Sequence, residues 1–229
     1  MVRTSLARYL CPSQGAEGFE EFMALIEIPN ICNSDAPASA AGRGRFVVTG
    51  EPLVAVDLIN TVAAPGSAVA DDLLSADLGV RAWWQVERAR VPGGDLPDTG
   101  ALRRLRLALR DMIEALMDGR PVPPAAVSDL NFFMQSAPAS TRLELTDTGI
   151  RGRTRWHCEY GGNPLLAFIA TEAAEFLSDR SQVRRLRRCA NPACSMIFIA
   201  VNPRRSWCAP AVCGNRVRVA RHHRRVVGA

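Results

Sequence analysis

Residues 189–216 read CANPACSMIFIAVNPRRSWCAPAVCGNR and contain two cysteine pairs, Cys189 with Cys194 and Cys208 with Cys213. Four residues separate the members of each pair, and thirteen separate the two pairs. Each pair suits a tight turn and the gap suits a chain that leaves and returns, as a tetrahedral site with four thiolate ligands requires. The spacing therefore predicts a zinc ion, Zn(2+), bound by these four cysteines, with ordinary buried thiols or disulfides as the alternative.

The gap between the pairs predicts a small β hairpin. Residues 196–201 are apolar and rich in β-branched side chains as in a strand, 202–203 form a turn, and 206–207 form the return strand. A segment of this size cannot bury a core of its own, so zinc is expected to stabilise its fold.

The second cysteine pair also predicts where a helix begins. Five positions along a helix rotate a side chain by about 500°, so Cys208 and Cys213 cannot share one helical face. We therefore expect Cys208 to precede the helix, Cys213 to lie in or near its first turn, and the helix to continue over 215–226. His222 and His223 are possible replacement ligands, but four thiolates already satisfy the metal.

Basic residues are concentrated at the carboxyl end of the chain. All 28 basic residues are arginines, and eleven of them follow residue 180, whereas all 23 acidic residues precede it. The tail therefore carries a charge of +11 and the rest of the chain −6. Such a tail on an acidic body predicts a polyanionic partner. Duplex DNA is expected, because few aromatic residues remain to stack unpaired bases, while RNA and a solvated tail without a partner are the alternatives.

The expected DNA contacts come from the turn and from the last helix. Arg218, Arg221 and Arg225 recur at helical spacing, so one face of that helix is cationic. Arginine binds phosphate or pairs with guanine, and asparagine pairs with adenine, so these residue types suit a DNA groove. The candidate contacts are Arg204, Arg205, Asn215, Arg216, Arg218, Arg221, Arg224 and Arg225. For Asn215 and Arg216 an alternative is that they hydrogen-bond to the thiolates or orient their loop.

Upstream of the cysteines, apolar periodicity predicts a mainly helical body. Helices are expected over 52–62, 72–87, 99–119, from 123 through 134 and from 164 to about 179, with a short strand over 46–48. Residues 143–145 and 154–158 flank Asp147, Thr148 and Gly149, which is typical of a β hairpin. These elements predict an α+β fold, in which a mainly helical body with a small antiparallel hairpin precedes a treble-clef-like zinc module.

Two of these helices have predicted buried faces. Over 72–87, the apolar positions are Leu74, Leu78, Ala82, Trp83 and Val86. Over 99–119, the apolar stripe consists of Leu102, Leu105, Leu109, Met112, Ile113 and Leu116, and Gly119 can supply a left-handed cap. The arginines of this helix, Arg103, Arg104, Arg106 and Arg110, are expected on its solvated faces.

Composition divides the chain into three regions. Residues 1–45 are expected to form a flexible extension and linker, 46–180 the body, and 181–229 the zinc finger. No stretch approaches the roughly 20 apolar residues of a membrane span, and the first residues lack the apolar run of a secretory signal. A cytoplasmic location without membrane attachment is therefore expected, and in that reducing compartment clustered thiols bind metal more often than they form disulfides.

One polar group in the body is a candidate ligand site. Asp57, Asn60 and Thr61 recur at helical spacing, so they can line one pocket for a small-molecule effector. The alternative is a buried hydrogen-bond network that holds the helix in place. No nucleophile with a base, no paired catalytic carboxylates and no phosphate-binding glycine loop is found, so we do not expect an enzyme. Nothing in the sequence sets the oligomeric state.

The tetrapeptide at 213–216, Cys-Gly-Asn-Arg, resembles the motif that names the CGNR zinc-finger family. Arg187, Arg188, the aromatic strand residue Phe198, and Trp207 before Cys208 agree with the pattern of that family. Val217 and Arg218 stand where the family usually has Ala and Lys, a change that retains the charge for phosphate binding.

Upstream, residues 50–61 (GEPLVAVDLINT) and 72–78 are similar to the ABATE domain, which precedes the zinc finger in this family. Together the two resemblances cover about residues 46–225. They imply a stress-induced transcription regulator whose zinc finger binds DNA. The alternative functions are a ligand- or protein-binding body with a purely structural zinc clip, and an RNA-binding protein.

Overall fold

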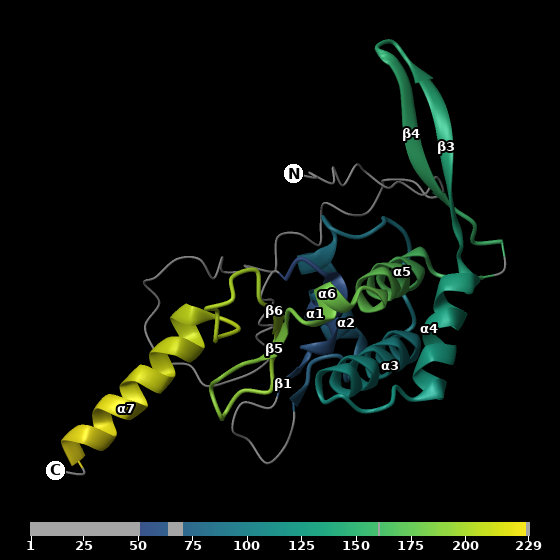
Figure 1. The fold of residues 1–229 in the computed structure, drawn as a ribbon. Helices are drawn as coiled ribbons and strands as arrows, with labels where there is room; N and C mark the ends of the chain where they lie inside the picture. The colour runs from purple at the N-terminus through teal and green to yellow at the C-terminus, as the bar shows by residue number, and fades with distance from the viewer. Residues whose placement is uncertain (1–50, 64–70, 160, 228–229) are drawn as a thin grey trace.

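Helices dominate the computed structural model, which describes residues 51–63, 71–159 and 161–227 (Figure 1). In chain order the elements are α1 (Val54–Ile59), β1 (Val62–Ala63), β2 (Asp71–Asp72), α2 (Asp77–Glu87), α3 (Thr99–Met117), α4 (Pro124–Ser136), β3 (Ala139–Thr146), β4 (Gly149–Trp156), α5 (Pro164–Ser178), α6 (Arg180–Val183), β5 (Leu186–Arg188), β6 (Ile197–Ile199), the π-helical turn η2 (Pro210–Gly214) and α7 (Asn215–Val227). The strands form three antiparallel pairs, β1 with β2, β3 with β4 and β5 with β6. These elements confirm the predicted α+β class. The extension predicted over 1–45 and the strand over 46–48 lie outside the described residues.

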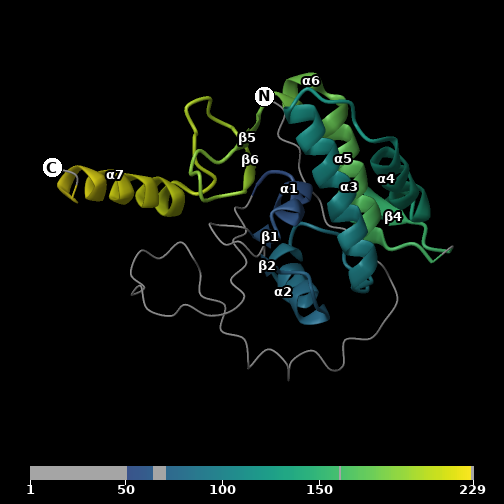
Figure 2. The same ribbon diagram turned by 90° about the horizontal axis from the view of Figure 1, so that it is seen from below.

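Helix α3 organises the core of the body. Its N-cap residue Asp98 accepts a hydrogen bond from the amide of Ala101 (2.9 Å), and Gly119 adopts a left-handed conformation (φ 65°) beyond its end. Its apolar stripe packs against α1, α4 and α5, which surround it in Figure 2. The buried residues include Leu102, Leu105, Leu109, Met112 and Ile113. The predicted helix, its capping glycine and its stripe are therefore confirmed, except that Leu116 at the end of the stripe is only half-buried.

Helix α5 begins where its sequence predicts. The Asn163 side chain accepts hydrogen bonds from the amides of Leu165 (3.0 Å) and Leu166 (3.3 Å), and Pro164 occupies the first helical position. These residues satisfy or remove amides that have no partner within the helix. Across the described residues no helix, α5 included, combines the length and hydrophobicity that a bilayer crossing requires.

Helix α2 differs from its prediction in both its start and its buried face. It begins at Asp77 rather than at Asp72, because Asp72 belongs to β2 and its carboxylate accepts a hydrogen bond from the amide of Leu74 (2.9 Å). The buried face consists of Val80, Trp83 and Glu87. Leu78 is 73% exposed and Val86 38% exposed, so their predicted burial is wrong. Leu78 lies two positions before Val80 and thus about 200° around the helix from it.

Arg106 on α3 is buried, although the sequence places it on a solvated face. Its guanidinium donates two hydrogen bonds to the Asp72 carboxylate (2.6 and 2.7 Å) and one to the Thr61 hydroxyl (3.0 Å). The hydrogen bonds from Arg106 hold the pKa of the Asp72 carboxyl below its usual value. Arg106 therefore links α3 to Asp72 of β2 and to Thr61, the residue before β1. The prediction of a solvated side chain is wrong for this arginine.

The predicted β hairpin is longer than expected. β3 and β4 pair over their full lengths, from Ala139 opposite Trp156 to Thr146 opposite Gly149. The turn contains Asp147 and Thr148, as predicted. The two strands project from the helical body in Figure 1, and we call this projection, residues 139–156, the β arm. The first residues of β3, 139–142, include polar side chains, so the apolar pattern predicted a strand only over 143–145.

The strand pairing of the carboxyl-terminal module differs from its prediction. β6 pairs with β5, with Leu186 opposite Ile199 and Arg188 opposite Ile197, and not with residues 206–207. The amide of Cys189 donates to the carbonyl of Met196 (3.0 Å) and extends this pairing. The loop between Cys189 and Cys194 is therefore part of the hairpin turn, so the metal ligands and the hairpin share one structural unit.

Candidate metal centre and its attachment to the body

The four cysteines of the sequence motif converge. Cys189, Cys194, Cys208 and Cys213 place their sulfur atoms within 4.8 Å of one another. Cys208 Sγ lies 3.8 Å from Cys194 Sγ and 3.6 Å from Cys213 Sγ. Four sulfurs bound tetrahedrally at about 2.3 Å from one zinc ion would be about 3.8 Å apart. The cluster therefore has the dimensions of a site for a single tetrahedral metal ion.

The local structure around the second pair agrees with the geometric prediction. Cys208 precedes the π-helical turn η2, and Cys213 lies within that turn, immediately before α7. A Cβ atom on Gly214 would lie 3.3 Å from the Trp207 ring, so glycine lets η2 pack closely against the indole. The Gly of the CGNR tetrapeptide thus has a packing role at the start of α7.

The thiols are electrostatically coupled. A hydrogen bond from Cys208 lowers the pKa of the Cys194 thiol to about 5. The interaction with Cys194 and burial both raise the pKa of the Cys208 thiol, and burial raises that of Cys213. Because neighbouring thiolates repel one another, a bound cation is needed for all four to ionise together.

Sequence reasoning missed Asn191, which lies in the loop between the first two cysteines. Its side chain is buried, accepts a hydrogen bond from the amide of Ala193 (3.1 Å) and hydrogen-bonds to Cys213. Burial raises the pKa of the Cys213 thiol, and the interaction with Asn191 opposes that rise and so favours the thiolate that a metal requires. The position of this polar residue between two predicted ligands, Cys189 and Cys194, was the feature of the sequence that could have identified it.

Strand β6 belongs to two hydrophobic cores. Ile197 and Ile199 pack in the core of the helical body, whereas Met196, Phe198 and Ala200 pack with the cysteines. This follows from the alternation of side chains along a strand. The metal site and the body therefore share one strand instead of meeting through a linker.

Side chains from the body occupy the free edge of β6. The Asn60 amide donates to the carbonyl of Ile197 (2.8 Å) and accepts from its amide (3.0 Å), as a neighbouring strand would. The Glu51 carboxylate accepts from the amide of Ile199 (2.8 Å). Glu51 and Asn60 are both buried, so each bond satisfies a backbone group that water cannot reach.

Arg205 was a candidate DNA contact, but the structure places its guanidinium inside this junction. It forms an ion pair with Glu51 (2.7 Å) and lies 4.5 Å from the centre of the Phe198 ring. It also donates to the carbonyls of Ile199 (3.1 Å), Trp207 (3.1 Å) and Cys208 (2.6 Å). A guanidinium with these partners is not available to a phosphate, so Arg205 is a positioning residue for the Cys208 loop.

The group Asp57, Asn60 and Thr61 is buried and forms part of a hydrogen-bond network. Asp57 accepts hydrogen bonds from the amide of Glu51 (3.1 Å) and from Arg90 (2.8 Å), and Arg90 also donates to the carbonyl of Glu51. Thr61 donates to the carbonyl of Leu58 (2.7 Å). These contacts fit the buried hydrogen-bond network that was the alternative to a ligand site. The network contacts the cysteine module through Glu51 and Asn60, which bond to β6.

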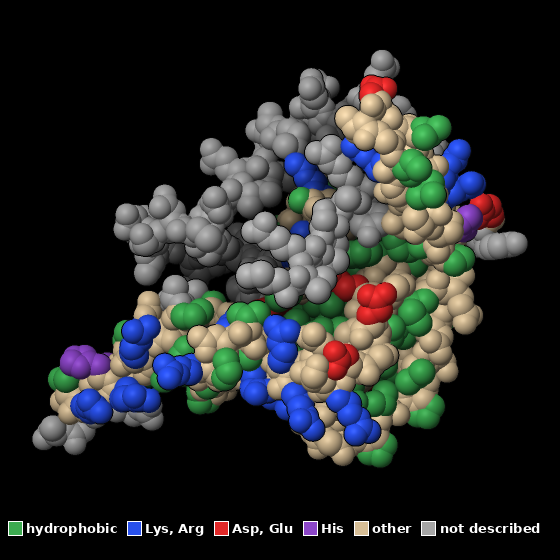
Figure 3. All heavy atoms as spheres, turned by 45° about the horizontal axis from the view of Figure 1, so that its top comes forward, with side chains coloured by type: hydrophobic (Ala, Val, Ile, Leu, Met, Phe, Trp, Pro, Cys, Tyr) green, Lys and Arg blue, Asp and Glu red, His purple; other side chains and the backbone are tan. Residues whose placement is uncertain are grey.

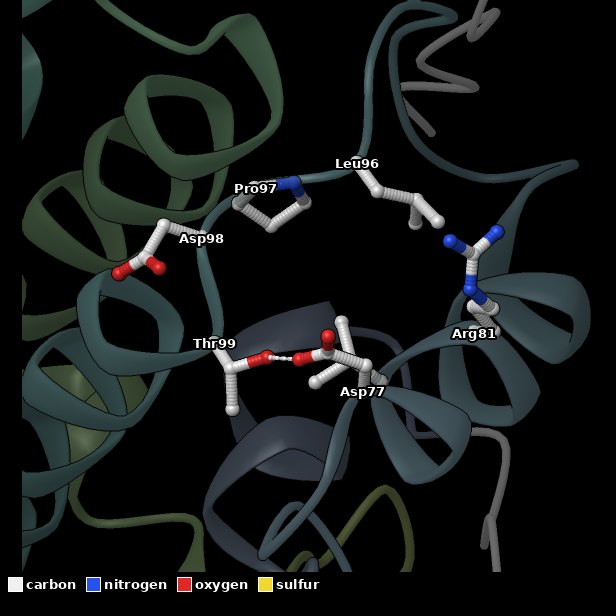
Figure 4. A pocket seen from close by; sticks show the side chains of 7 residues that line it. Asp77, Arg81, Leu96, Pro97, Asp98 and Thr99 are labelled. Atoms are coloured by element: carbon white, nitrogen blue, oxygen red, sulfur yellow. Dashed lines mark hydrogen bonds between the residues drawn. The ribbon is translucent and has the colours of Figure 1, made fainter.

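A surface pocket lies elsewhere, between the start of α2 and the segment before α3 (Figure 4). It encloses about 220 Å³ and is lined by residues that include Arg81, Leu96 and Asp98. Asp77 and Thr99 form a hydrogen bond at its floor (2.5 Å). This pocket contains none of the residues that the sequence singled out.

Three carboxylates, Asp57, Glu87 and Glu172, lie close to Arg90 in the network behind α1. Arg90 contacts Asp57 and Glu87 at 2.8 Å each, and one oxygen of Glu87 has no hydrogen-bond partner among the described residues. Burial, reinforced by Asp57, raises the pKa of Glu87 to about 7. Burial also raises the pKa of Glu172 to about 7, although Glu172 accepts a hydrogen bond from the amide of Val54 (3.0 Å).

These raised values predict that stability falls as pH increases. The folded protein keeps a proton on Glu87 up to a pKa of about 7, whereas the unfolded chain releases it near 4.5. The contribution is therefore fully present below about pH 4.5 and is lost as pH rises to about 7, by on the order of 3 kcal/mol for this group. Glu87→Gln should be more stable than wild type at pH 8 and should flatten the pH dependence.

Urea unfolding between pH 5.5 and 8 measures this effect. Excess zinc must be present throughout, because acid releases metal from thiolates. The matched control is Glu175→Gln, at an exposed position on α5. An equal pH dependence in wild type and in Glu87→Gln would contradict the assignment.

The remaining candidate DNA contacts lie on the surface. Asn215, Arg216, Arg218, Arg221 and Arg225 are exposed on α7, and Arg204 is exposed in the turn before Trp207. Arg218 also donates to the carbonyl of Gly214 (3.2 Å). The side chain of Arg224 lies outside the described residues. Figure 3 shows arginines gathered over α7 at the lower left, and no acidic residue follows residue 180 to neutralise them.

Comparisons with known families agree with the two parts of the chain. The ABATE model, described as "Putative stress-induced transcription regulator", matches residues 53–180. The CGNR zinc finger model matches residues 185–226. No curated protein is similar enough in sequence to count as a relative. The ABATE match covers more than half of the chain, so this protein belongs to the ABATE family and carries a CGNR zinc finger after the ABATE region.

Proposed function

We propose that this protein is a transcriptional regulator that binds duplex DNA through α7, on a module held together by one zinc ion. The observation that carries the proposal is the exposed arginine surface of α7, directly after the metal cluster. The four thiols also fit a reducing compartment such as the cytoplasm, where they remain available to metal.

Zinc is the metal that the donor set favours. Four sulfur ligands at tetrahedral spacing suit zinc or an iron centre, and they do not suit magnesium or calcium. All four positions are filled by protein, which is typical of a structural zinc site and leaves none open for a reacting water. This supports a structural role for the metal.

Helix α7 has the shape and charge for a DNA groove. Its 13 residues span about 20 Å, and the major groove of B-DNA, about 12 Å wide, admits one helix. α7 extends away from the helical body in both views of the fold. Arg218, Arg221 and Arg225 lie at i, i+3 and i+7, so they share one face of α7. A purely structural zinc clip would not need this extended cationic helix.

Salt dependence tests this function. Four to six phosphate contacts predict that the logarithm of affinity falls with the logarithm of salt concentration with a slope of roughly −4 to −5. Arg218→Gln, Arg221→Gln and Arg225→Gln should each flatten the slope by about one unit if the residue contacts phosphate. The control is Arg88→Gln, at an exposed position at the end of α2. Titrations of zinc-loaded protein on duplexes of different sequence provide the measurement.

Two outcomes would redirect the proposal. Zinc-loaded protein that binds no duplex DNA at low salt would favour the ligand- or protein-binding body with a structural zinc clip. Tighter binding to RNA than to DNA of the same sequence would favour the RNA alternative.

A further inference from the structure

The β arm has two chemically different faces. Successive residues of a strand point to opposite sides, and the register of β3 and β4 shows which residues are neighbours across the arm. One face is apolar and contains Thr141, Leu143, Leu145, Ile150 and Thr154. The other face is basic and contains Arg142, Glu144, Arg151, Arg153 and Arg155. Figure 3 shows hydrophobic and arginine side chains next to one another on the arm, at the upper right.

The basic face carries charge that the protein does not neutralise. Arg142 lies directly opposite Arg153, a like-charged pair that destabilises a two-stranded sheet. Glu144 pairs with Arg153 (2.7 Å) and is the one carboxylate on this face of the described arm. Near the base of the arm, a backbone hydrogen bond and His157 lower the pKa of the Glu159 carboxyl, and Arg155 makes a smaller contribution in the same direction. The arm thus carries four arginines against two acids, Glu144 on the basic face and Asp147 in the turn, and Glu159 lies near its base.

The arginines of α3 are arranged differently. Arg104 pairs with Asp129 (2.5 Å), Arg106 with Asp72 (2.6 Å) and Arg110 with Glu114 (2.8 Å). Among the described residues, Arg142 and Arg151 of the arm have no carboxylate at ion-pair distance. An isolated two-stranded ribbon is only marginally stable, so like charges on one of its faces lower the stability of the arm further.

We infer that the basic face of the β arm is a second contact for duplex DNA, separate from α7. This inference rests on the proposed function. The major groove admits a two-stranded antiparallel ribbon, and eight residues of strand span about 26 Å. Arg142, Arg151 and Arg153 then lie next to phosphates or guanine edges, both of which bind arginine. DNA supplies the negative charge that the arm lacks.

The apolar face does not favour a second copy of the chain as the main partner. Its large exposed residues are Leu143, Leu145 and Ile150, at 68%, 89% and 71% exposure. Three such side chains cover far less than the roughly 800 Å² per partner that a stable dimer interface buries. The charge of the opposite face is therefore the stronger indication of what the arm binds.

The experiment compares substitutions on the two faces of the arm in full-length, zinc-loaded protein. Arg142→Gln with Arg151→Gln should flatten the salt slope of duplex binding by about two units and weaken binding at low salt about tenfold or more. The control, Leu145→Thr with Ile150→Thr, changes the apolar face and should leave the slope unchanged. Melting curves establish that both variants fold, and the single variant Arg142→Gln should flatten the slope by about one unit.

The possible results separate this inference from the proposed function. If α7 substitutions weaken binding but Arg142→Gln with Arg151→Gln binds as wild type does, the arm inference is wrong and the proposed function stands. If wild type binds no duplex DNA, both are wrong. If the apolar-face variant loses as much affinity as the basic-face variant and changes from dimer to monomer by light scattering, a second copy occupies the arm and the inference fails.

Discussion

Cys208→Ser should release the metal and unfold the carboxyl-terminal module. Cys208 is buried between Cys194 and Cys213, so its loss removes the ligand nearest to two others. Structural zinc contributes an apparent free energy of roughly 10 to 16 kcal/mol in small zinc modules, so losing one thiolate should cost at least about 5 kcal/mol. That is comparable to the whole stability of many domains.

The effect should extend beyond the module. Ile197 and Ile199 of β6 lie in the core of the body, so disordering β6 exposes that core. A boundary at residue 180 between the body and the zinc finger would leave the helices of the body intact after metal removal, but the shared strand changes this expectation. We therefore expect the thermal unfolding midpoint of the helical signal to fall as well.

Metal analysis and far-ultraviolet circular dichroism measure both parts of this prediction. Wild type should carry about one zinc per chain, and Cys208→Ser close to none. Cys158→Ser, at a cysteine outside the cluster, is the matched control. A full zinc content in Cys208→Ser would show that the cluster is not the metal site. A normal zinc loss with an unchanged melting curve of the body would show that β6 is dispensable to the body.

Glu51→Gln should destabilise the protein strongly although it changes none of the four clustered cysteines. Its carboxylate is completely buried, pairs with Arg205 (2.7 Å) and accepts the amide hydrogen of Ile199 (2.8 Å). Removing one partner of a buried ion pair leaves an uncompensated charge and costs about 3 to 5 kcal/mol. Because Arg205 donates to the carbonyl of Cys208, zinc affinity should fall too.

A double-mutant cycle separates this pair from general damage. Arg205→Met alone should also destabilise, but combining it with Glu51→Gln should cost less than the sum, by roughly 1 to 3 kcal/mol. Asp129→Asn, which breaks the exposed pair with Arg104, is the control and should cost no more than about 1 kcal/mol. Additive effects of Glu51→Gln and Arg205→Met in urea unfolding would refute the coupling between body and module.

Local patterns predicted much of this molecule. The cysteine spacing identified the metal cluster because thiol ligands must come from a few positions joined by tight turns. The apolar stripe of α3 was readable because residues three or four positions apart lie on the same face of a helix. The position of Cys208 before the helix followed from helix geometry alone.

Errors arose where a residue's partner is distant in the chain. Leu78 looks like part of a buried stripe, but α2 begins five residues later than the pattern suggests, because Asp72 serves β2 and Arg106. Arg205 looks like a surface arginine beside Arg204, yet its partner Glu51 is 154 residues away. The pattern pairs β6 with residues 206–207, but its partner is β5, which precedes the first cysteine.

The sequence by itself determined which four cysteines converge, the helical body, the position of the hairpin and the cationic tail, because each depends on residue types at short spacing. Only the tertiary structure showed that side chains of the body, Asn60 and Glu51, bond to the edge of β6 that β5 leaves free. Asn60 reaches Ile197 across 137 residues and Glu51 reaches Ile199 across 148. Such long-range bonds require that the core brings the two segments together. They do not produce a periodic pattern of residue types in the sequence. The same buried contacts place the Arg205 guanidinium against the Cys208 loop, whereas Arg218, Arg221 and Arg225 of α7 lie on the surface.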